Sequence, residues 1–261
     1  MTFQEKLEQI KREGYSFSVS DVVSNSVNLV TKKLLWFSIG FILIVGIISS
    51  VIGSIANIFA DTSPYSQGLL IEEPSLDNMM KFYAAYFTPL VTVITIIASL
   101  VSYSLYYSYI YIAKKADLGE EYSMSDMFLI IKSSRVWGFI GLYLMIMIMI
   151  GIGSVLCVLP GIYLAVATSL AIPIYLFNDN MSPMDAIKAS ISTVNKKFFT
   201  ILWAQVLLGL ISIVGVIACC IGLLATYNIL YAGQYFIYKE IFGIESKKIF
   251  DIDEIGQAET Y

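Results

Sequence analysis

The longest uncharged stretch of the chain is residues 136–178, VWGFIGLYLMIMIMIGIGSVLCVLPGIYLAVATSLAIPIYLFN, which contains no Asp, Glu, Lys or Arg. A helix needs about 20 mostly apolar residues to cross a bilayer, and this stretch has room for two such helices. Its centre carries Val158-Leu-Pro-Gly161, and the Pro-Gly pair is a turn signal. We therefore expect two transmembrane helices joined by a short hairpin.

Three further uncharged stretches lie on either side of the first one: residues 34–60, 82–113 and 198–238. The first two are long enough for one crossing each, and the last is long enough for a pair. Charged residues make up only 14% of the chain, against roughly 25% in a typical soluble domain. The sequence therefore predicts an all-α polytopic membrane bundle of six transmembrane helices.

This pattern divides the chain into three parts. Residues 1–33 form a segment with an amphipathic interfacial helix, residues 34–243 form the six-helix transmembrane domain, and residues 244–261 form an acidic tail. The first 33 residues contain no short apolar core of the kind found in signal peptides. We expect the first crossing itself to direct insertion into the membrane.

The basic residues predict the orientation of the bundle. With six crossings, every Lys and Arg except Lys81 falls on one side of the membrane. Lys81 lies in the connection 61–81, beside several Asp and Glu residues. Cytoplasmic loops carry an excess of Lys and Arg. We therefore expect both termini in the cytoplasm and the loop 61–81 outside.

The composition excludes several classes of function. The chain has no histidine, and its three cysteines (Cys157, Cys219 and Cys220) do not form a Cys-x-x-Cys pair. Histidine-based triads, common zinc sites and thioredoxin-like motifs are therefore excluded. No ionisable acid or base lies in the middle of a predicted crossing, which weakens the case for an ion-coupled pump. The net charge of −4 argues against nucleic-acid binding. We expect neither an enzyme nor a bound cofactor or metal.

Three segments on the predicted cytoplasmic side begin alike, with Ser18-Val-Ser-Asp21, Ser123-Met-Ser-Asp126 and Ser182-Pro-Met-Asp185. Each resembles a helix-capping box with Asp in place of Glu, so Ser18, Asp21, Ser123, Asp126, Ser182 and Asp185 are predicted to be structural caps. In the first and third copies an apolar face follows, formed by Val23, Val27, Val30 and Leu34 and by Ile187, Ile191, Val194 and Phe198. We expect a pseudo-three-fold repeat of an interfacial helix followed by a transmembrane hairpin.

Short motifs in these segments resemble a known family. Phe17-Ser-Val-Ser-Asp21, Leu159-Pro-Gly-Ile-Tyr163 and Ser182-Pro-Met-Asp-Ala-Ile-Lys-Ala-Ser190 are similar to the glycerophosphodiesterase membrane-domain family and related bacterial six-helix membrane proteins. The resemblance spans about residues 15–243. It implies the fold and a location in the bacterial inner membrane. It implies no catalysis, because fused members of the family take their activity from a separate soluble domain.

Polar residues inside the predicted membrane region are the candidates for ligand binding. They are Gln205, Asn228, Gln234, Tyr103 and Tyr107. Gln205 and Gln234 lie at similar depths in the last hairpin, so we favour a hydrogen bond between its two helices over a substrate contact. The tyrosines belong to a cluster ending at Tyr111, for which an aromatic belt at the membrane interface is favoured over a pocket for a lipid headgroup or small molecule.

Two functions remain after these exclusions. The favoured one is a non-enzymatic accessory or scaffold subunit that engages membrane lipids or a partner membrane complex, with a protein partner or a second copy of the chain as the possible companions. The alternative is a transporter or permease of a small apolar or amphipathic substrate. A water-filled, polar-lined cavity would favour the transporter, and a tightly packed interior with an exposed apolar groove would favour the accessory subunit.

Overall fold

The computed structural model describes residues 2–59, 88–215 and 226–244, and every regular element within them is a helix. Within these residues, five helical segments are long and apolar enough to cross a membrane: Leu35–Ala56, Pro89–Leu118, Val136–Leu156, Val158–Phe177 and Pro183–Val214. The all-helical, polytopic membrane class is therefore confirmed. The predicted loop 61–81, Cys219, Cys220 and the tail from residue 245 lie outside the described residues.

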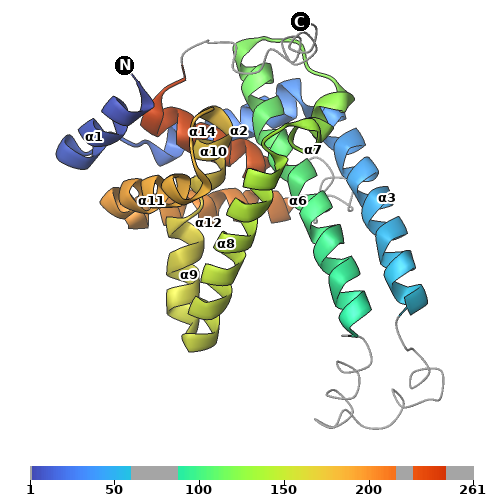
Figure 1. Cartoon of the computed structure of the whole chain (residues 1–261). Helices are drawn as coiled ribbons and strands as arrows, with labels where there is room; N and C mark the ends of the chain where they lie inside the picture. Colours follow the sequence, from blue (N-terminus) through green and yellow to red (C-terminus); the bar gives the residue numbers. More distant parts are fainter. Residues whose placement is uncertain (1, 60–87, 216–225, 245–261) are drawn as a thin grey trace, which may run out of the picture.

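The helices occur in the following order (Figure 1). They are α1 (Phe3–Glu13), α2 (Val19–Asn28), the π-helical turn η1 (Leu29–Lys33), α3 (Leu35–Phe59), α6 (Pro89–Leu118), the 3₁₀ turn η2 (Met124–Phe128), α7 (Leu129–Lys132), α8 (Val136–Leu156), α9 (Val158–Ala167), α10 (Ala171–Phe177), α11 (Pro183–Val194), the 3₁₀ turn η3 (Asn195–Lys197), α12 (Phe198–Val214) and α14 (Ile229–Phe242).

The helices α3 and α6 form one antiparallel pair, and α8 and α9 form a second (Figure 1). The α8–α9 turn is tighter than the sequence predicts, because Cys157 alone, in an extended conformation, separates the helices. Pro160 and Gly161 lie in the first turn of α9, where a proline is tolerated since its missing N–H would be unpaired. A Cβ at Gly161 would lie 3.0 Å from the Cα of Ser154, so glycine permits this close packing.

The fourth predicted crossing is broken into α9 and α10 at Thr168–Leu170. An unbroken helix would require an N–H at position 173 to bind the carbonyl of Ser169, but Pro173 has none and its ring would clash there. Ser190 of α11 forms hydrogen bonds with two backbone groups at the break that have no partner within the helix. Its hydroxyl donates to the carbonyl of Ala167 at 2.7 Å and accepts the N–H of Leu170 at 3.2 Å.

The helix α14 lies in the protein interior. It packs against α2, α6 and α12, and most of its side chains are buried. A Cβ at Gly233 would lie 2.4 Å from Cδ1 of Leu208, so glycine brings α14 close to α12. At 14 residues α14 is too short to count as a candidate span by itself. Because residues 216–225 lie outside the described part, the sixth crossing stays a prediction.

The predicted helix caps have the expected geometry. The side chains of Ser18 and Ser182 accept the N–H groups of Asp21 and Asp185 at 3.3 Å and 3.2 Å. At the start of η2 the N–H of Ser123 donates to Oδ2 of Asp126 at 2.9 Å, and the N–H of Asp126 donates to the backbone carbonyl of Ser123 at 3.1 Å. The buried face of α2 is centred on Val22 and Ser26, and the predicted Val23 and Val27, one position away, are half-buried. On α11 the predicted Ile187 and Val194 are buried. The pseudo-three-fold repeat stays a prediction.

Basic side chains join distant segments at one end of the bundle, which we call the basic end. Lys33 donates to the carbonyl of Ala116 at 3.1 Å, Lys115 pairs with Asp126 at 3.2 Å, and Lys239 pairs with Asp117. Tyr15 donates to the carbonyl of Thr193 at 3.1 Å, which ties the N-terminal segment to α11. Burial raises the pKa of Tyr15, so this hydroxyl remains a donor.

Candidate intramembrane ligand cavity

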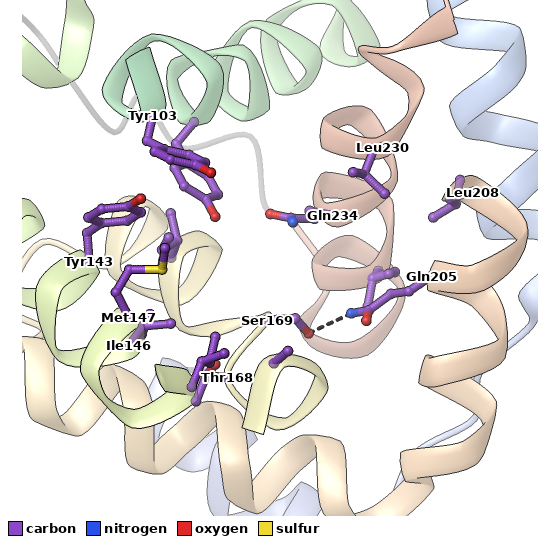
Figure 2. Close-up of a pocket in the computed structure, with 15 residues that line it drawn as sticks. Tyr103, Tyr143, Ile146, Met147, Thr168, Ser169, Gln205, Leu208, Leu230 and Gln234 are labelled. Carbon is purple, nitrogen blue, oxygen red and sulfur yellow. Dashed lines mark hydrogen bonds between the residues drawn. The ribbon is translucent and has the colours of Figure 1, made fainter. Parts of the chain in front are cut away.

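A cavity of about 320 Å³ lies among α6, α8, α9, α10, α12 and α14 (Figure 2). This volume is at the lower end of the roughly 300–1,000 Å³ of small-molecule sites. The lining residues are Tyr103, Tyr107, Tyr143, Ile146, Met147, Ile150, Ala165, Thr168, Ser169, Ile172, Gln205, Leu208, Leu230, Gln234 and Ile237. Four of the five sequence candidates are therefore brought together at one site.

Tyrosine rings form one wall of the cavity. The ring centroids of Tyr103 and Tyr143 are 4.9 Å apart, and those of Tyr103 and Tyr107 are 6.4 Å apart. Tyr107 also packs edge-on against Phe139 of α8 and Tyr231 of α14. These contacts place the tyrosines between helices, with their hydroxyl ends near the cavity (Figure 2).

The aromatic-belt interpretation is wrong for this part of α6. Tyr109 is fully buried with its hydroxyl 2.6 Å from Oγ of Ser38, and Tyr111 is also buried. A belt requires side chains that face lipid headgroups, whereas α3, α14 and the segment formed by η2 and α7 pack against α6. The sequence could not distinguish the two arrangements, because tyrosines spread around a helix satisfy both.

The amide groups of the two glutamines do not pair with each other, contrary to the interpretation favoured from the sequence. Gln205 of α12 instead donates from Nε2 to Oγ of Ser169 at 2.6 Å, so it contacts the break between α9 and α10 (Figure 2). The Oε1 atom of Gln234 on α14 is buried and has no hydrogen-bond partner among the described residues. Its amide points into the cavity, toward the tyrosine wall (Figure 2).

The broken helix contributes the polar floor of the cavity. Thr168 donates its hydroxyl to the carbonyl of Leu164 at 2.7 Å, and Ser169 accepts from Gln205. Both residues are adjacent to the irregular backbone that Pro173 imposes. Thr168, Ser169 and Tyr143 were not among the candidate ligand-binding residues that the sequence indicated. For Thr168 and Ser169 the sequence signal was a pair of hydroxyl residues in an apolar stretch, five and four residues before Pro173.

Asn228, the fifth sequence candidate, lies outside this cavity. Its Nδ2 atom donates to the carbonyl of Ser38 at 3.3 Å, and its Oδ1 atom is buried without a hydrogen-bond partner among the described residues. It therefore joins the start of α14 to the start of α3. This position gives Asn228 a role in helix packing.

The described cavity lining contains no Asp, Glu, Lys or Arg. Within the described residues there is also no cluster of three metal-ligating acidic or cysteine side chains. The arrangement therefore offers hydroxyl and amide groups next to aromatic and aliphatic surface. Such a lining recognises a molecule by hydrogen bonds and apolar contact.

Comparison of the chain with protein-family models, curated proteins and solved structures finds no match. The class is therefore defined by the fold and the cavity. The chain is an α-helical protein with five segments long and apolar enough to cross a membrane, and its helices line an uncharged, mostly apolar cavity that carries a few hydroxyl and amide groups.

Proposed function

We propose that this protein binds a small amphipathic molecule within the membrane and functions as a transporter or permease for it. The observation that carries the proposal is the cavity itself, which combines the unpaired Oε1 atom of Gln234 with the helix break at Thr168–Leu170. Discontinuous helices whose irregular backbone lines a cavity are a recurring feature of substrate sites in transporters. The mixed polar and apolar lining matches an amphipathic substrate.

This proposal ranks the transporter above the accessory subunit that the sequence alone favoured, because the cavity presents hydroxyl and amide groups between the helices, although most of its lining is apolar. The accessory role stays a prediction. Native mass spectrometry of the protein in detergent-free nanodiscs tests it. A stoichiometric companion protein would favour the accessory subunit. The chain alone, with one enriched lipid or metabolite, would favour transport.

We also propose that the protein lies in a bacterial inner membrane with both termini in the cytoplasm. The distribution of Lys and Arg supports this orientation, and so does the clustering of basic residues from several segments at the basic end. Membership of the glycerophosphodiesterase membrane-domain family stays a prediction. The proposal contains no catalytic step.

A direct experiment uses a long-chain alcohol that carries a photoreactive diazirine, with the full-length protein in lipid nanodiscs. We expect saturable labelling at cavity residues, mapped by peptide sequencing. Ala165 lines the cavity, so Ala165→Phe should reduce this labelling at least several-fold by filling space. Leu159→Phe, at an exposed position of the same helix that does not line the cavity, should leave it unchanged. Non-saturable labelling spread over the lipid-facing surface would contradict the proposal.

A further inference from the structure

The chemistry of the cavity also restricts the ligand, if the proposed function holds. A charged head placed among the described lining residues would meet no opposite charge, since none of them is Asp, Glu, Lys or Arg. On α14, Lys239 lies five residues beyond Gln234, or about 7.5 Å along the helix axis, and it is already paired with Asp117. On α6, Lys114 lies two turns beyond Tyr107, or about 10 Å along the axis. A buried charge without a partner is strongly disfavoured inside a membrane protein. The lining therefore selects against ions.

Gln234 adds a requirement for hydrogen bonding. Its Oε1 atom is buried without a partner among the described residues, which is costly unless a ligand supplies a donor. The Nε2 atom of the same amide is a donor, so this side chain can both accept and donate a hydrogen bond. The smallest uncharged group that both donates and accepts a hydrogen bond is a hydroxyl. A cavity of about 320 Å³ leaves little room for a larger polar head together with an apolar body.

The remaining lining suits the apolar body of such a molecule. Ile146 and Met147 of α8 and Leu208 of α12 present aliphatic surface beside the tyrosine rings. Gln205 is already satisfied by Ser169, so Gln234 is the amide left to bind a ligand. The two glutamines thus have different roles: Gln205 fixes the helix break, and Gln234 faces the substrate.

We propose that the cavity selects uncharged amphiphiles that carry a hydroxyl head, and that Gln234 is the residue that distinguishes this head from others. The substrate class is therefore a long-chain alcohol or a neutral lipid with a free hydroxyl group. Anionic and cationic amphiphiles of the same chain length are excluded by the uncharged lining.

The test compares three competitors of equal chain length against the diazirine alcohol in nanodiscs: dodecanol, dodecyl methyl ether and dodecylammonium. Concentrations are expressed as mole fractions in the membrane, which removes differences in partitioning. We expect dodecanol to compete about ten-fold better than the ether, since the ether lacks the donor. Dodecylammonium should compete no better than the ether.

Gln234→Met is nearly isosteric and lacks the amide, so it should reduce the alcohol-to-ether ratio to near one without weakening binding of the ether. Glu240→Gln, at an exposed position of the same helix, should keep the ten-fold ratio. Gln234→Leu provides a second variant should the first fail to fold.

Two outcomes separate this inference from the proposed function. Equal competition by alcohol and ether in the unaltered protein, or strong competition by the ammonium, would overturn the hydroxyl specificity while the cavity remained a binding site. Failure of every compound to compete would instead overturn the proposed function itself.

Discussion

Arg135 shows how much a single side chain contributes at the junction between two helices. Its Nη2 atom donates to the carbonyls of Tyr175 and Asn178 at 2.9 and 3.0 Å, at the end of α10. Its guanidinium lies 4.2 Å from the centroid of the Tyr175 ring, and the Tyr175 hydroxyl donates back to the carbonyl of Arg135 at 3.2 Å. Nη1 also lies 3.6 Å from the carboxylate of Asp179. A basic residue that the sequence identifies only as a topology anchor therefore closes α10 onto α8.

Arg135→Lys is expected to destabilise the fold by about 1–2 kcal/mol, although the charge is kept. A lysine cannot reproduce the planar fork that binds two carbonyls while stacking on a ring. Reversible unfolding in mixed micelles would measure the loss. Lys132→Gln is the matched control, because Lys132 is exposed, and it should change stability by less than about 0.5 kcal/mol. Equal effects of the two variants would show that the hydrogen bonds of Arg135 contribute nothing.

At the scale of the element, the break between α9 and α10 depends on a partner helix. Pro173 removes one backbone hydrogen bond, and the hydroxyl of Ser190 then satisfies two backbone groups that would otherwise be buried and unpaired. The break places Thr168 and Ser169 on the cavity floor. The helix α11 thus stabilises a break that Pro173 imposes, and the hydroxyl groups of Thr168 and Ser169 become part of the site.

Ser190→Ala is expected to cost about 1–3 kcal/mol, because it leaves buried backbone groups at the break unpaired. Ser192 is a close control on the same helix, since its hydroxyl donates only within α11, to the carbonyl of Ala189 at 3.0 Å. Ser192→Ala should have little effect. The same unfolding assay, combined with hydrogen exchange of the Leu170 amide, would reveal the difference. Unchanged protection of Leu170 in Ser190→Ala would refute the role of Ser190.

At the scale of the whole molecule, basic side chains from distant segments gather at the basic end of the bundle. Contacts at the basic end join the N-terminal segment, the end of α6, the segment before α8 and the end of α14. These residues are far apart in the sequence, yet the predicted topology assigns all of them to one side of the membrane. The Lys33, Lys115 and Lys239 contacts therefore support the proposed orientation.

The orientation can be tested with single cysteines in a background where Cys157, Cys219 and Cys220 are alanine. Glu121→Cys should react with a membrane-impermeant maleimide only in inverted vesicles, since the proposed topology puts this exposed residue in the cytoplasm. Ser75→Cys, in the loop 61–81, should react only in intact cells. Labelling of both cysteines from the same side would require an even number of crossings between them and would contradict the topology.

The sequence by itself determined the membrane class, the positions of the apolar helices and the helix starts at Ser18 and Ser182. These properties depend on short stretches and on their transfer from water to lipid, so each can be evaluated along the chain. It also identified Gln205, Gln234, Tyr103 and Tyr107 as polar residues at membrane depth.

Only the tertiary structure decided that these four residues line one cavity, that Gln205 binds Ser169 and not Gln234, and that Tyr109 and Tyr111 are buried among neighbouring helices. In lipid, apolar periodicity does not distinguish a face that contacts acyl chains from one that contacts protein, because both are apolar. Which faces meet is settled by close packing between distant segments, as at Gly233 and Leu208, and by the backbone groups that a break leaves unpaired.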